Sequence, residues 1–399
     1  MCFNKINPSK FGVLSTIGEE VIIDFSKRRY KTKVNDNGAW EVKLREQKYN
    51  TTPQTIRVQS GENETTLKNI LIGDLWLLIG QSNMEWPMEA EMHYENELPH
   101  AKNSKLRFYN PKYVGKNIYG SPFNKEQVEK LEDGELFYDG KWEVSDTSSI
   151  KKMSAIGYYF GKAIINSENI PIGLINLSIG GAPLETFIDT QTLKENPKFS
   201  TKISETWLEN NFLPIWIRER GMENIGNNSA EDKTTDNHAY KPGFAFSSAI
   251  EPLLKMPVKG VLWYQGESNA QEMERVKEYR ELQKLMLEDY RERWNNKNLP
   301  FYYVQLSSID TAKYDSHYWP EFRDGQRRFL DEIKNVGMAV SSDIGNKNDV
   351  HPRNKKVVGE RLARWALKTE YGRDVLPSGP LVKKVIYKGG NIVVEFKYA

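Results

Sequence analysis

The first part of the chain alternates apolar and polar residues at the short period of β-strands. Such runs occupy residues 20–25, 30–34, 39–44 and 55–58. Asn37-Gly38 lies between two of them and is a strong signal for a hairpin turn. No helical period interrupts this region, so residues 1–68 are predicted to form a small antiparallel β module.

From about residue 69 the pattern changes to continuous apolar runs that alternate with amphipathic segments. The expected strands are 72–79, 172–179, 258–264, 301–306 and 337–341, and the expected helices are 154–167, 244–255, 270–294, 320–334 and 354–369. Continuous apolar strands between helices are typical of a parallel sheet covered on both faces. Residues 69–376 are therefore predicted to be an α/β domain with a mostly parallel sheet, in which the polar stretch 196–240 is an insertion over the site.

After Pro377 the pattern returns to β. Residues 382–387 and 392–396 flank Gly389-Gly390 and predict a hairpin within 377–399. Two strands are too few to be stable alone. The hairpin is therefore expected to pack on the N-terminal β module.

The amino-acid composition excludes several classes of protein. The chain has 399 residues, and 56 Lys and Arg against 54 Asp and Glu give a net charge of +2, so neither nucleic acid nor a membrane surface is an expected partner. No apolar run approaches the roughly 18 residues of a membrane helix. The single cysteine, Cys2, excludes an internal disulfide framework and a multi-cysteine metal site. The first residues lack the apolar segment of a signal peptide, so a cytoplasmic location is the default expectation, and a periplasmic or secreted one applies if the N-terminus is trimmed.

Ser82 is the first candidate for chemistry. It lies two residues after Gly80 at the end of a predicted strand, where a tight turn can expose its hydroxyl. It matches the first half of the G-x-S-x-G nucleophile motif, with Met84 in place of the second glycine. The alternative interpretation is a turn serine that caps the next segment.

His351 is the candidate general base. It precedes Pro352, a residue favoured in the first turn of a helix, so it is expected at the mouth of the sheet. An exposed loop histidine is the alternative. His93 and His100 lack the spacing of a metal pair, and no metal or cofactor is expected. His238 is a candidate pocket residue.

Two further strand ends offer hydrogen-bond donors. Gly181 could give its backbone N–H to a developing oxyanion, or it could only satisfy the backbone angles of a turn. The amide of Gln265 could be a second donor or a hydrogen-bonded strand end, and Glu267 could hold this loop or be an ion-paired or capping carboxylate. A hydroxyl, an imidazole and such donors are the groups needed for acyl transfer through a serine.

Three motifs, in this order, resemble one family. They are GQSNME at 80–85, WYQGESN at 263–269 and DVHP at 349–352, and they are similar to the sialate O-acetylesterase branch of the SGNH (GDSL-like) hydrolases. The resemblance spans about residues 69–380. It implies a three-layer α/β/α fold of the SGNH type, with the β module and the C-terminal hairpin as a small antiparallel accessory domain.

The resemblance also implies roles for single residues. Ser82 corresponds to the nucleophile and His351 to the general base. Gly181 and Gln265 fall at the positions of oxyanion donors, together with the backbone N–H of Ser82.

The carboxylate that would orient the histidine is left open. The superfamily has an aspartate three residues before the histidine, where this chain has Asn348, and Asp349 stands two residues before it. The alternatives are Asp349, Asp343, a backbone carbonyl, or a Ser–His dyad alone.

The implied reaction is removal of acetyl groups from a sugar, most readily an O-acetylated sialic acid, with acetylated xylan or another polysaccharide ester as the competing substrate. Arg323 or Arg327 could pair with the sialate carboxylate, although a structural ion pair is the ordinary role of a helix arginine. Trp86, Trp263 and Trp319 could form a sugar platform, with at least one expected in the core. The expected substrate contacts are Glu267, Trp263, Arg323 and His238.

Two other classes of function remain as alternatives. A glycosidase could use Glu85 and Glu267, which would have to lie about 5–9.5 Å apart across a cleft. The second alternative is a carbohydrate-binding protein without catalysis.

Overall fold

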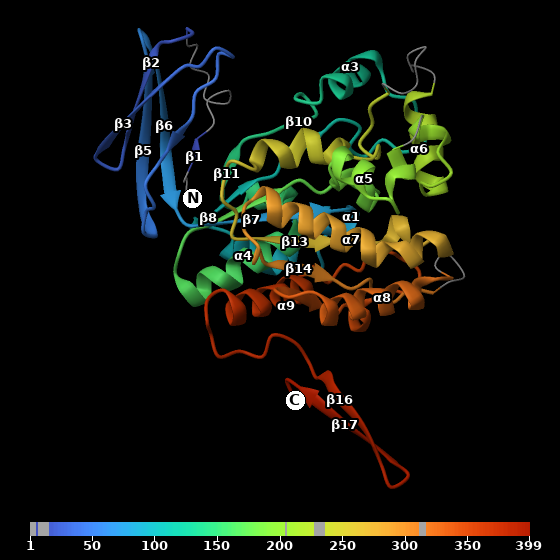
Figure 1. Cartoon of the computed structure of the whole chain (residues 1–399). Helices are drawn as coiled ribbons and strands as arrows, with labels where there is room; N and C mark the ends of the chain where they lie inside the picture. Colours follow the sequence, from blue (N-terminus) through green and yellow to red (C-terminus); the bar gives the residue numbers. More distant parts are fainter. Residues whose placement is uncertain (1–4, 7–15, 204–205, 227–235, 311–316) are drawn as a thin grey trace.

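The computed structural model of the chain describes residues 5–6, 16–203, 206–226, 236–310 and 317–399 (Figure 1). Its largest sheet has seven strands in the order β11-β8-β12-β7-β13-β14-β15. All neighbouring pairs are parallel except β11 with β8. The strands are β7 (Asp74–Gly80), β8 (Asn103–Tyr109), β11 (Trp142–Ser145), β12 (Ile172–Asn176), β13 (Gly260–Tyr264), β14 (Phe301–Val304) and β15 (Val336–Ala339). The predicted mixed α/β fold with a large, mostly parallel sheet is confirmed.

Helices cover both faces of this sheet. On one face Trp76 of β7 packs edge-on against Phe160 of α4 (Ala155–Glu168), with ring centroids 4.9 Å apart, and α9 (Lys355–Thr369) lies beside α4. On the other face Trp263 of β13 donates a hydrogen bond to the hydroxyl of Tyr279 in α7 (Met273–Arg293). There α8 (Trp319–Glu332) packs beside α7. The strands are buried on both faces, which explains why their sequences are continuously apolar.

Four of the five predicted helices are α4, α7, α8 and α9, with ends that differ by at most three residues from the prediction. The fifth predicted segment, 244–255, is helical over most of its length but is not a regular α-helix. The chain forms a π-helical turn at Phe246–Ile250 and a 3₁₀ turn at Glu251–Leu253, where Pro252 has no N–H to donate to a preceding turn. The sequence pattern also did not predict β8 and β11.

A second, four-stranded antiparallel sheet precedes the α/β domain, in the order β3-β2-β5-β6. Its strands are β2 (Glu20–Phe25), β3 (Arg28–Lys33), β5 (Asn50–Ser60) and β6 (Asn63–Ile72). It has its own core, to which Val21, Ile23, Phe25, Ile56 and Val58 contribute. Only Gly73 separates β6 from β7, so the two sheets are joined directly.

The hairpin predicted at Asn37-Gly38 is wrong. A turn does form there, with Gly38 at φ 73°, but the strands beside it do not pair with each other. β3 instead pairs with β2 through the two-residue turn Ser26-Lys27, in which both residues have positive φ. β4 (Val42–Lys43) pairs with β1 (Lys5–Ile6).

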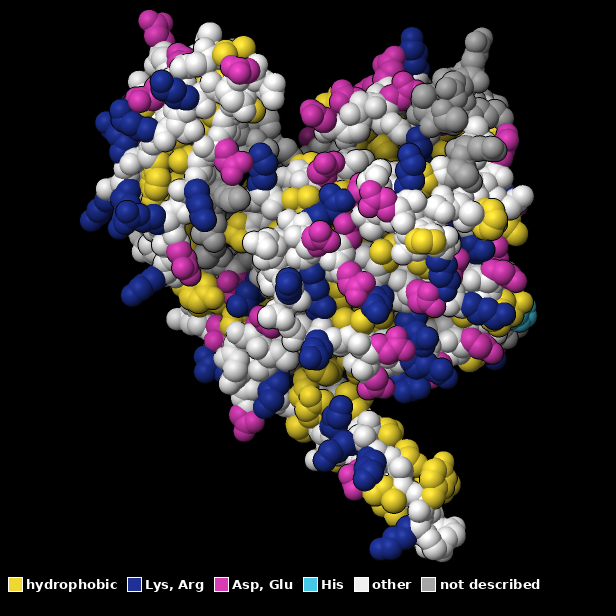
Figure 2. Space-filling model, in the orientation of Figure 1, with side chains coloured by type: hydrophobic (Ala, Val, Ile, Leu, Met, Phe, Trp, Pro, Cys, Tyr) yellow, Lys and Arg dark blue, Asp and Glu magenta, His cyan; other side chains and the backbone are white. Residues whose placement is uncertain are grey.

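The C-terminal hairpin consists of β16 (Leu381–Lys388) and β17 (Asn391–Lys397). It forms a sheet of its own and extends away from the body, on a different side from the N-terminal sheet (Figure 1). Figure 2 shows hydrophobic side chains on its surface. Tyr387 and Ile392 of this hairpin are 79% and 65% exposed. The prediction that it packs on the N-terminal module is wrong, because its base is held on α9, where the ring of Tyr398 packs edge-on against Trp365.

None of the helices in the described part of the chain combines the length and the hydropathy that a bilayer crossing requires. Cys2 and most of the first fifteen residues lie outside the described ranges.

Candidate active site

The strand order places three loops at one edge of the sheet. β8, β11 and β12 lie on one side of β7, and β13, β14 and β15 lie on the other. β12 and β13 are therefore the two neighbours of β7. Ile179 N–H donates to the carbonyl of Gly80, and Gln81 N–H donates to that of Tyr264. The segments that follow β7, β12 and β13 therefore meet at the carboxyl edge, where open α/β sheets bind ligands.

Ser82 begins the short helix α1 (Ser82–Glu85) directly after this edge. The turn into the helix requires glycine at position 80, which has φ 127° and whose Cβ would lie 2.1 Å from the carbonyl oxygen of Tyr264. Because Ser82 is in the first turn of α1, its N–H has no intrahelical acceptor. Ser82 thus presents both a hydroxyl and a backbone N–H that has no acceptor among the residues described here.

The structure brings Ser82 and His351 together from the two ends of the α/β domain. The distance from Ser82 Oγ to His351 Nε2 is 2.8 Å. The indole of Trp86 stacks on the imidazole, with ring centroids 5.2 Å apart and 22° between the planes. Both residues of the pair are half-buried and reach the same cavity, which is the geometry of a nucleophile beside its base.

Asp349 is the carboxylate beside this histidine. Its Oδ1 accepts the His351 backbone N–H at 2.8 Å and lies 3.5 Å from His351 Nδ1. Asp343, the competing candidate, has its two carboxylate oxygens bound by Arg361 at 2.7 Å each. The geometry therefore favours Asp349 for the orienting role.

The surroundings of His351 favour a neutral imidazole. Burial lowers the pKa of His351 below 6.5, and the charge of Lys355 lowers it further, while Asp349 opposes both effects. Lys355 is fully buried, and burial lowers the pKa of this amine to about 7. A neutral histidine can accept a proton from the serine at neutral pH.

Asn83 joins the three loops behind the Ser82–His351 pair. Its Nδ2 donates to Glu267 Oε1 at 2.5 Å and to the carbonyl of Val350 at 3.0 Å, and Lys355 donates to its Oδ1. The sequence interpretation did not include Asn83 or Lys355. The feature that could have identified them is a polar residue at a position that the hydrophobic pattern of the surrounding elements predicts to be buried.

A cavity of about 990 Å³ opens at Ser82 and His351. Trp86, Tyr113 and Tyr119 are among its lining residues, and much of its wall comes from residues 110–143. None of the described residues of the predicted insertion 196–240 is among the residues that line this cavity. A part of the insertion lies instead against the loop after β12, since a Cβ on Gly181 would be 2.7 Å from the ring of Trp216.

The structure does not bring Gln265 to the cavity. Its side chain is fully buried, and its Nε2 donates to Asn269 Oδ1 at 2.7 Å, with longer contacts to Gln81 Oε1 and the carbonyl of Ala182. Its Oε1 accepts from the hydroxyl of Tyr279. The prediction of an oxyanion donor at Gln265 is wrong, because internal partners already use its amide hydrogens.

Three predicted substrate contacts are wrong because the side chains are buried. Trp263 and Glu267 are at most 1% exposed and lie behind the loops that carry the site. His238 is stacked between the rings of Phe123 and Trp207, and burial lowers its pKa to about 3. Their buried positions are consistent with structural roles and leave no surface for contact with a substrate.

The predicted arginines also lie outside the cavity lining. Arg323 belongs to α8 and is not among the residues that line the Ser82 cavity. Arg327, on the same helix, is paired with Asp324. Trp319 is buried and donates to the carbonyl of Ser307, so of the three predicted platform residues only Trp86 lines the cavity.

The carboxylates required for a glycosidase do not face each other. Glu85 lies at the cavity, where it pairs with Lys116 at 2.6 Å and accepts from the hydroxyl of Tyr113. Glu267 is buried against Asn83 and does not line the cavity. Glu267 therefore cannot act as the second carboxylate of a glycosidase across the cleft from Glu85.

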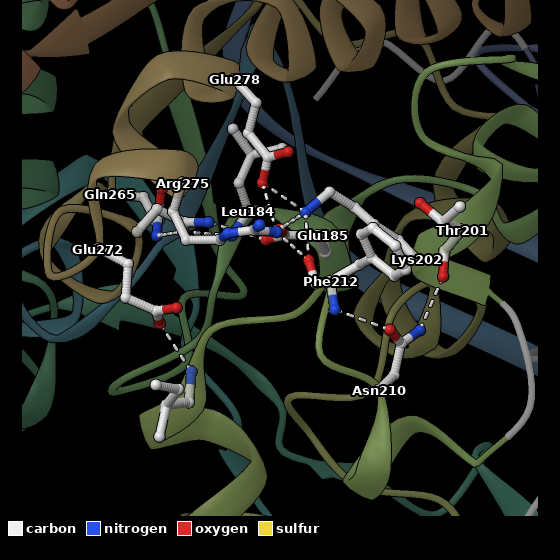
Figure 3. Close-up of polar contacts among 12 residues, drawn as sticks. Leu184, Glu185, Thr201, Lys202, Asn210, Phe212, Gln265, Glu272, Arg275 and Glu278 are labelled. Carbon is white, nitrogen blue, oxygen red and sulfur yellow. Dashed lines mark hydrogen bonds and ion pairs between the residues drawn. The ribbon is translucent and has the colours of Figure 1, made fainter.

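A buried ion cluster holds the insertion to the α/β domain (Figure 3). Lys202 Nζ lies 2.8 Å from Glu185 Oε1 and 2.6 Å from Glu278 Oε1, and it also donates to the carbonyl of Phe212. Asn269 donates to the other oxygen of Glu185 and so links the cluster to the loop after β13. The positive charge of Lys202 keeps the pKa of Glu185 below its usual value although the carboxyl is fully buried.

Comparisons with known proteins identify carbohydrate esterases that are similar to this chain. A family model for "Carbohydrate esterase, sialic acid-specific acetylesterase" matches residues 234–368. The sialate O-acetylesterase of Mus musculus is 26% identical over 353 residues, which cover 83% of this chain and 62% of that protein. The Homo sapiens protein of the same name is 28% identical over 339 residues, covering 79% of this chain and 57% of that protein. The chain thus spans about three fifths of the length of these relatives.

A solved structure with the same overall fold is a carbohydrate acetylesterase from Xanthomonas citri, with a TM-score of 0.76 and 28% sequence identity over 99% of this chain and 77% of that one. These findings confirm a resemblance to the carbohydrate esterases as a class. Within that class they confirm the resemblance to the sialate O-acetylesterases that the three motifs predicted.

Proposed function

We propose that this chain is a serine esterase that removes O-acetyl groups from carbohydrate, most readily from O-acetylated sialic acids. The observation that carries the proposal is the 2.8 Å contact of Ser82 Oγ with His351 Nε2 at the mouth of a cavity of about 990 Å³. The sialate preference rests on the relatives named above. The α/β domain is then of the SGNH type, and the N-terminal sheet corresponds to the accessory β domain.

The reaction proceeds through an acetyl-enzyme. His351 Nε2 takes the proton of Ser82 as Oγ attacks the acetyl carbonyl carbon, and the imidazolium that forms is stabilised by Asp349. The oxyanion is bound by the N–H groups of Ser82 and Gly181. The bond to the sugar oxygen then breaks, and His351 gives that oxygen its proton. A water molecule, deprotonated by His351, attacks the acetyl-enzyme and releases acetate, and the proton returns to Ser82.

The test of the function is acetate release from a panel of substrates. The purified chain is incubated with O-acetylated sialic acids, acetylated xylan oligomers and p-nitrophenyl acetate, and acetate is measured enzymatically. We expect release from all ester classes, with the highest kcat/KM for the acetylated sialic acids. A higher kcat/KM for xylan oligomers would replace the proposed substrate, and glycan binding without any acetate release would contradict the esterase assignment.

The pH dependence of kcat/KM is expected to follow His351. Only the neutral imidazole accepts the serine proton, so kcat/KM should rise with pH and level off above a midpoint below 6.5. Lys355→Met removes a positive charge that disfavours protonation of His351, so this midpoint should move to higher pH. The measurement is kcat/KM for p-nitrophenyl acetate between pH 4.5 and 8.

Lys356→Met is the matched control for this prediction. Lys356 neighbours Lys355 in α9, but it is partly exposed and pairs with Glu97. Its removal should leave the midpoint where it is in the wild type. Equal midpoints in all three proteins would show that the charge of Lys355 does not act on the base.

A further inference from the structure

The loop after β12 is a tight turn whose central peptide carries the N–H of Gly181. The N–H of Ala182 donates to the carbonyl of Ile179 at 3.0 Å, which closes the turn around Gly180 and Gly181. Gly181 has φ 77°, the value for the third residue of a type II turn, whereas a type I turn has a negative φ there. The two types differ by a flip of the central peptide, which reverses the directions of the Gly180 carbonyl and the Gly181 N–H.

Every other polar group of this turn has a partner. Gly180 N–H donates to the hydroxyl of Tyr113 at 3.0 Å, and that hydroxyl donates to Glu85 at 3.0 Å. The carbonyl of Gly181 accepts from Ser268 at 2.8 Å. Among the described residues, the N–H of Gly181 finds no acceptor. Gly181 is half-buried and follows β12, which pairs with β7, so its N–H lies at the same edge of the sheet as Ser82.

A residue of the insertion 196–240 binds the carbonyl of the central peptide, that of Gly180. Tyr240 donates its hydroxyl to the Gly180 oxygen at 2.8 Å. Tyr240 is itself fixed, since its backbone N–H donates to His238 Nδ1 and its ring packs against Trp216. Burial raises the pKa of Tyr240, so its hydroxyl keeps the proton that it donates.

We propose that Tyr240 is a positioning residue of the oxyanion site: its hydroxyl holds the Gly180–Gly181 peptide in the type II orientation that presents the Gly181 N–H to the oxyanion. This inference rests on the proposed esterase function. A carbonyl that accepts a hydrogen bond also polarises its own peptide and makes the attached N–H a better donor. Tyr240 thus acts through the Gly180–Gly181 peptide, whose carbonyl oxygen accepts its hydroxyl hydrogen bond.

Tyr240→Phe tests the proposal by removing only the hydroxyl. Loss of an oxyanion donor typically lowers kcat by about 10²–10³-fold, and a donor that is misoriented part of the time should cost less. We expect kcat for p-nitrophenyl acetate to fall roughly 10–100-fold with KM nearly unchanged. A crystal structure of the variant should show the Gly180–Gly181 peptide flipped, wholly or in part.

Tyr303→Phe is the matched control. Tyr303 is also buried, and its hydroxyl also donates to a backbone carbonyl, that of Gln326 at 2.6 Å, in a contact between β14 and α8. This variant should lose a similar amount of stability and keep the wild-type kcat.

Three outcomes overturn the proposal. A wild-type kcat in folded Tyr240→Phe would show that the hydroxyl is dispensable, and a lower kcat with the peptide unmoved would show that it acts otherwise. A wild-type protein without activity on any acetyl ester would remove the esterase function and the oxyanion site together, so the wild-type assay separates the two failures.

Discussion

Ser82→Ala is expected to lower kcat for acetate release by about 10⁵–10⁶-fold, to the level left by the cavity and the oxyanion donors alone. The reason is that, within the part of the chain that the structure describes, no other hydroxyl is hydrogen-bonded to the imidazole of His351, whose Nε2 lies 2.8 Å from Ser82 Oγ. His351→Ala should cost a similar factor, because the serine proton then has no acceptor. The double variant should be no slower than either single variant, since the two residues act as one unit.

The measurement is acetate release from the preferred ester under saturating conditions, with circular dichroism to verify folding. His93→Ala is the control: His93 is also half-buried and hydrogen-bonded to a carboxylate, that of Glu91, but it does not line the cavity. It should retain the wild-type kcat. Losses that multiply in the double variant would mean that Ser82 and His351 act in separate steps, and would contradict the proposed pair.

The placement of Ser82 and His351 at one edge of the sheet could be predicted because backbone rules determine it. A glycine at the end of a buried strand exposes the next hydroxyl, and the carboxyl ends of parallel strands share one edge. These two rules were enough to expect Ser82 and His351 at one edge without knowledge of the strand order. The order itself, with β12 and β13 on either side of β7, is what makes the expected edge a single site.

The direction of side chains could not be predicted in the same way. Gln265 follows a strand at the correct edge, but its amide points behind the loops and is bonded to Asn269. The choice between Asp349 and Asp343 depended on Arg361, which lies in α9 and occupies Asp343. Long-range partners of this kind leave no periodic signal in a sequence.

The cavity wall at residues 110–143 was missed for a related reason. Its strands β9 (Lys112–Tyr113) and β10 (Tyr138–Asp139) have two residues each, too short for an alternating pattern to be seen. α3 (Lys125–Asp133) buries only Leu131. Short elements with little buried surface are positioned by tertiary contacts and are the least visible to pattern analysis.

Lys202→Met is expected to lower the free energy of unfolding of the α/β domain by about 3–5 kcal/mol. The side chain of Lys202 is 1% exposed and that of Glu185 is fully buried. The substitution leaves a carboxylate in the core, and among the described residues only Asn269 then donates a side-chain hydrogen bond to it. The charge of Glu185 is compatible with burial only while the ammonium group is beside it. The measurement is urea unfolding followed by tryptophan fluorescence, with an unchanged m-value.

Two variants and the pH dependence separate this effect from a general loss of packing. Lys198→Met removes an exposed ion pair with Glu281 and should cost less than about 1 kcal/mol. Glu185→Gln, added to Lys202→Met, removes the uncompensated charge and should restore most of the loss.

In the wild type the pKa of Glu185 is lowered, so its contribution to stability is present above pH 4.5 and is lost as the pH falls through the folded-state pKa. In Lys202→Met the opposing positive charge is gone, and burial, the largest effect on this carboxyl, should raise that pKa, so the difference between the two proteins should be largest at neutral pH and shrink on acidification. A difference that stays constant from pH 7 to 4 would mean that the lost packing of the lysine chain, and not the unpaired carboxylate, accounts for the destabilisation.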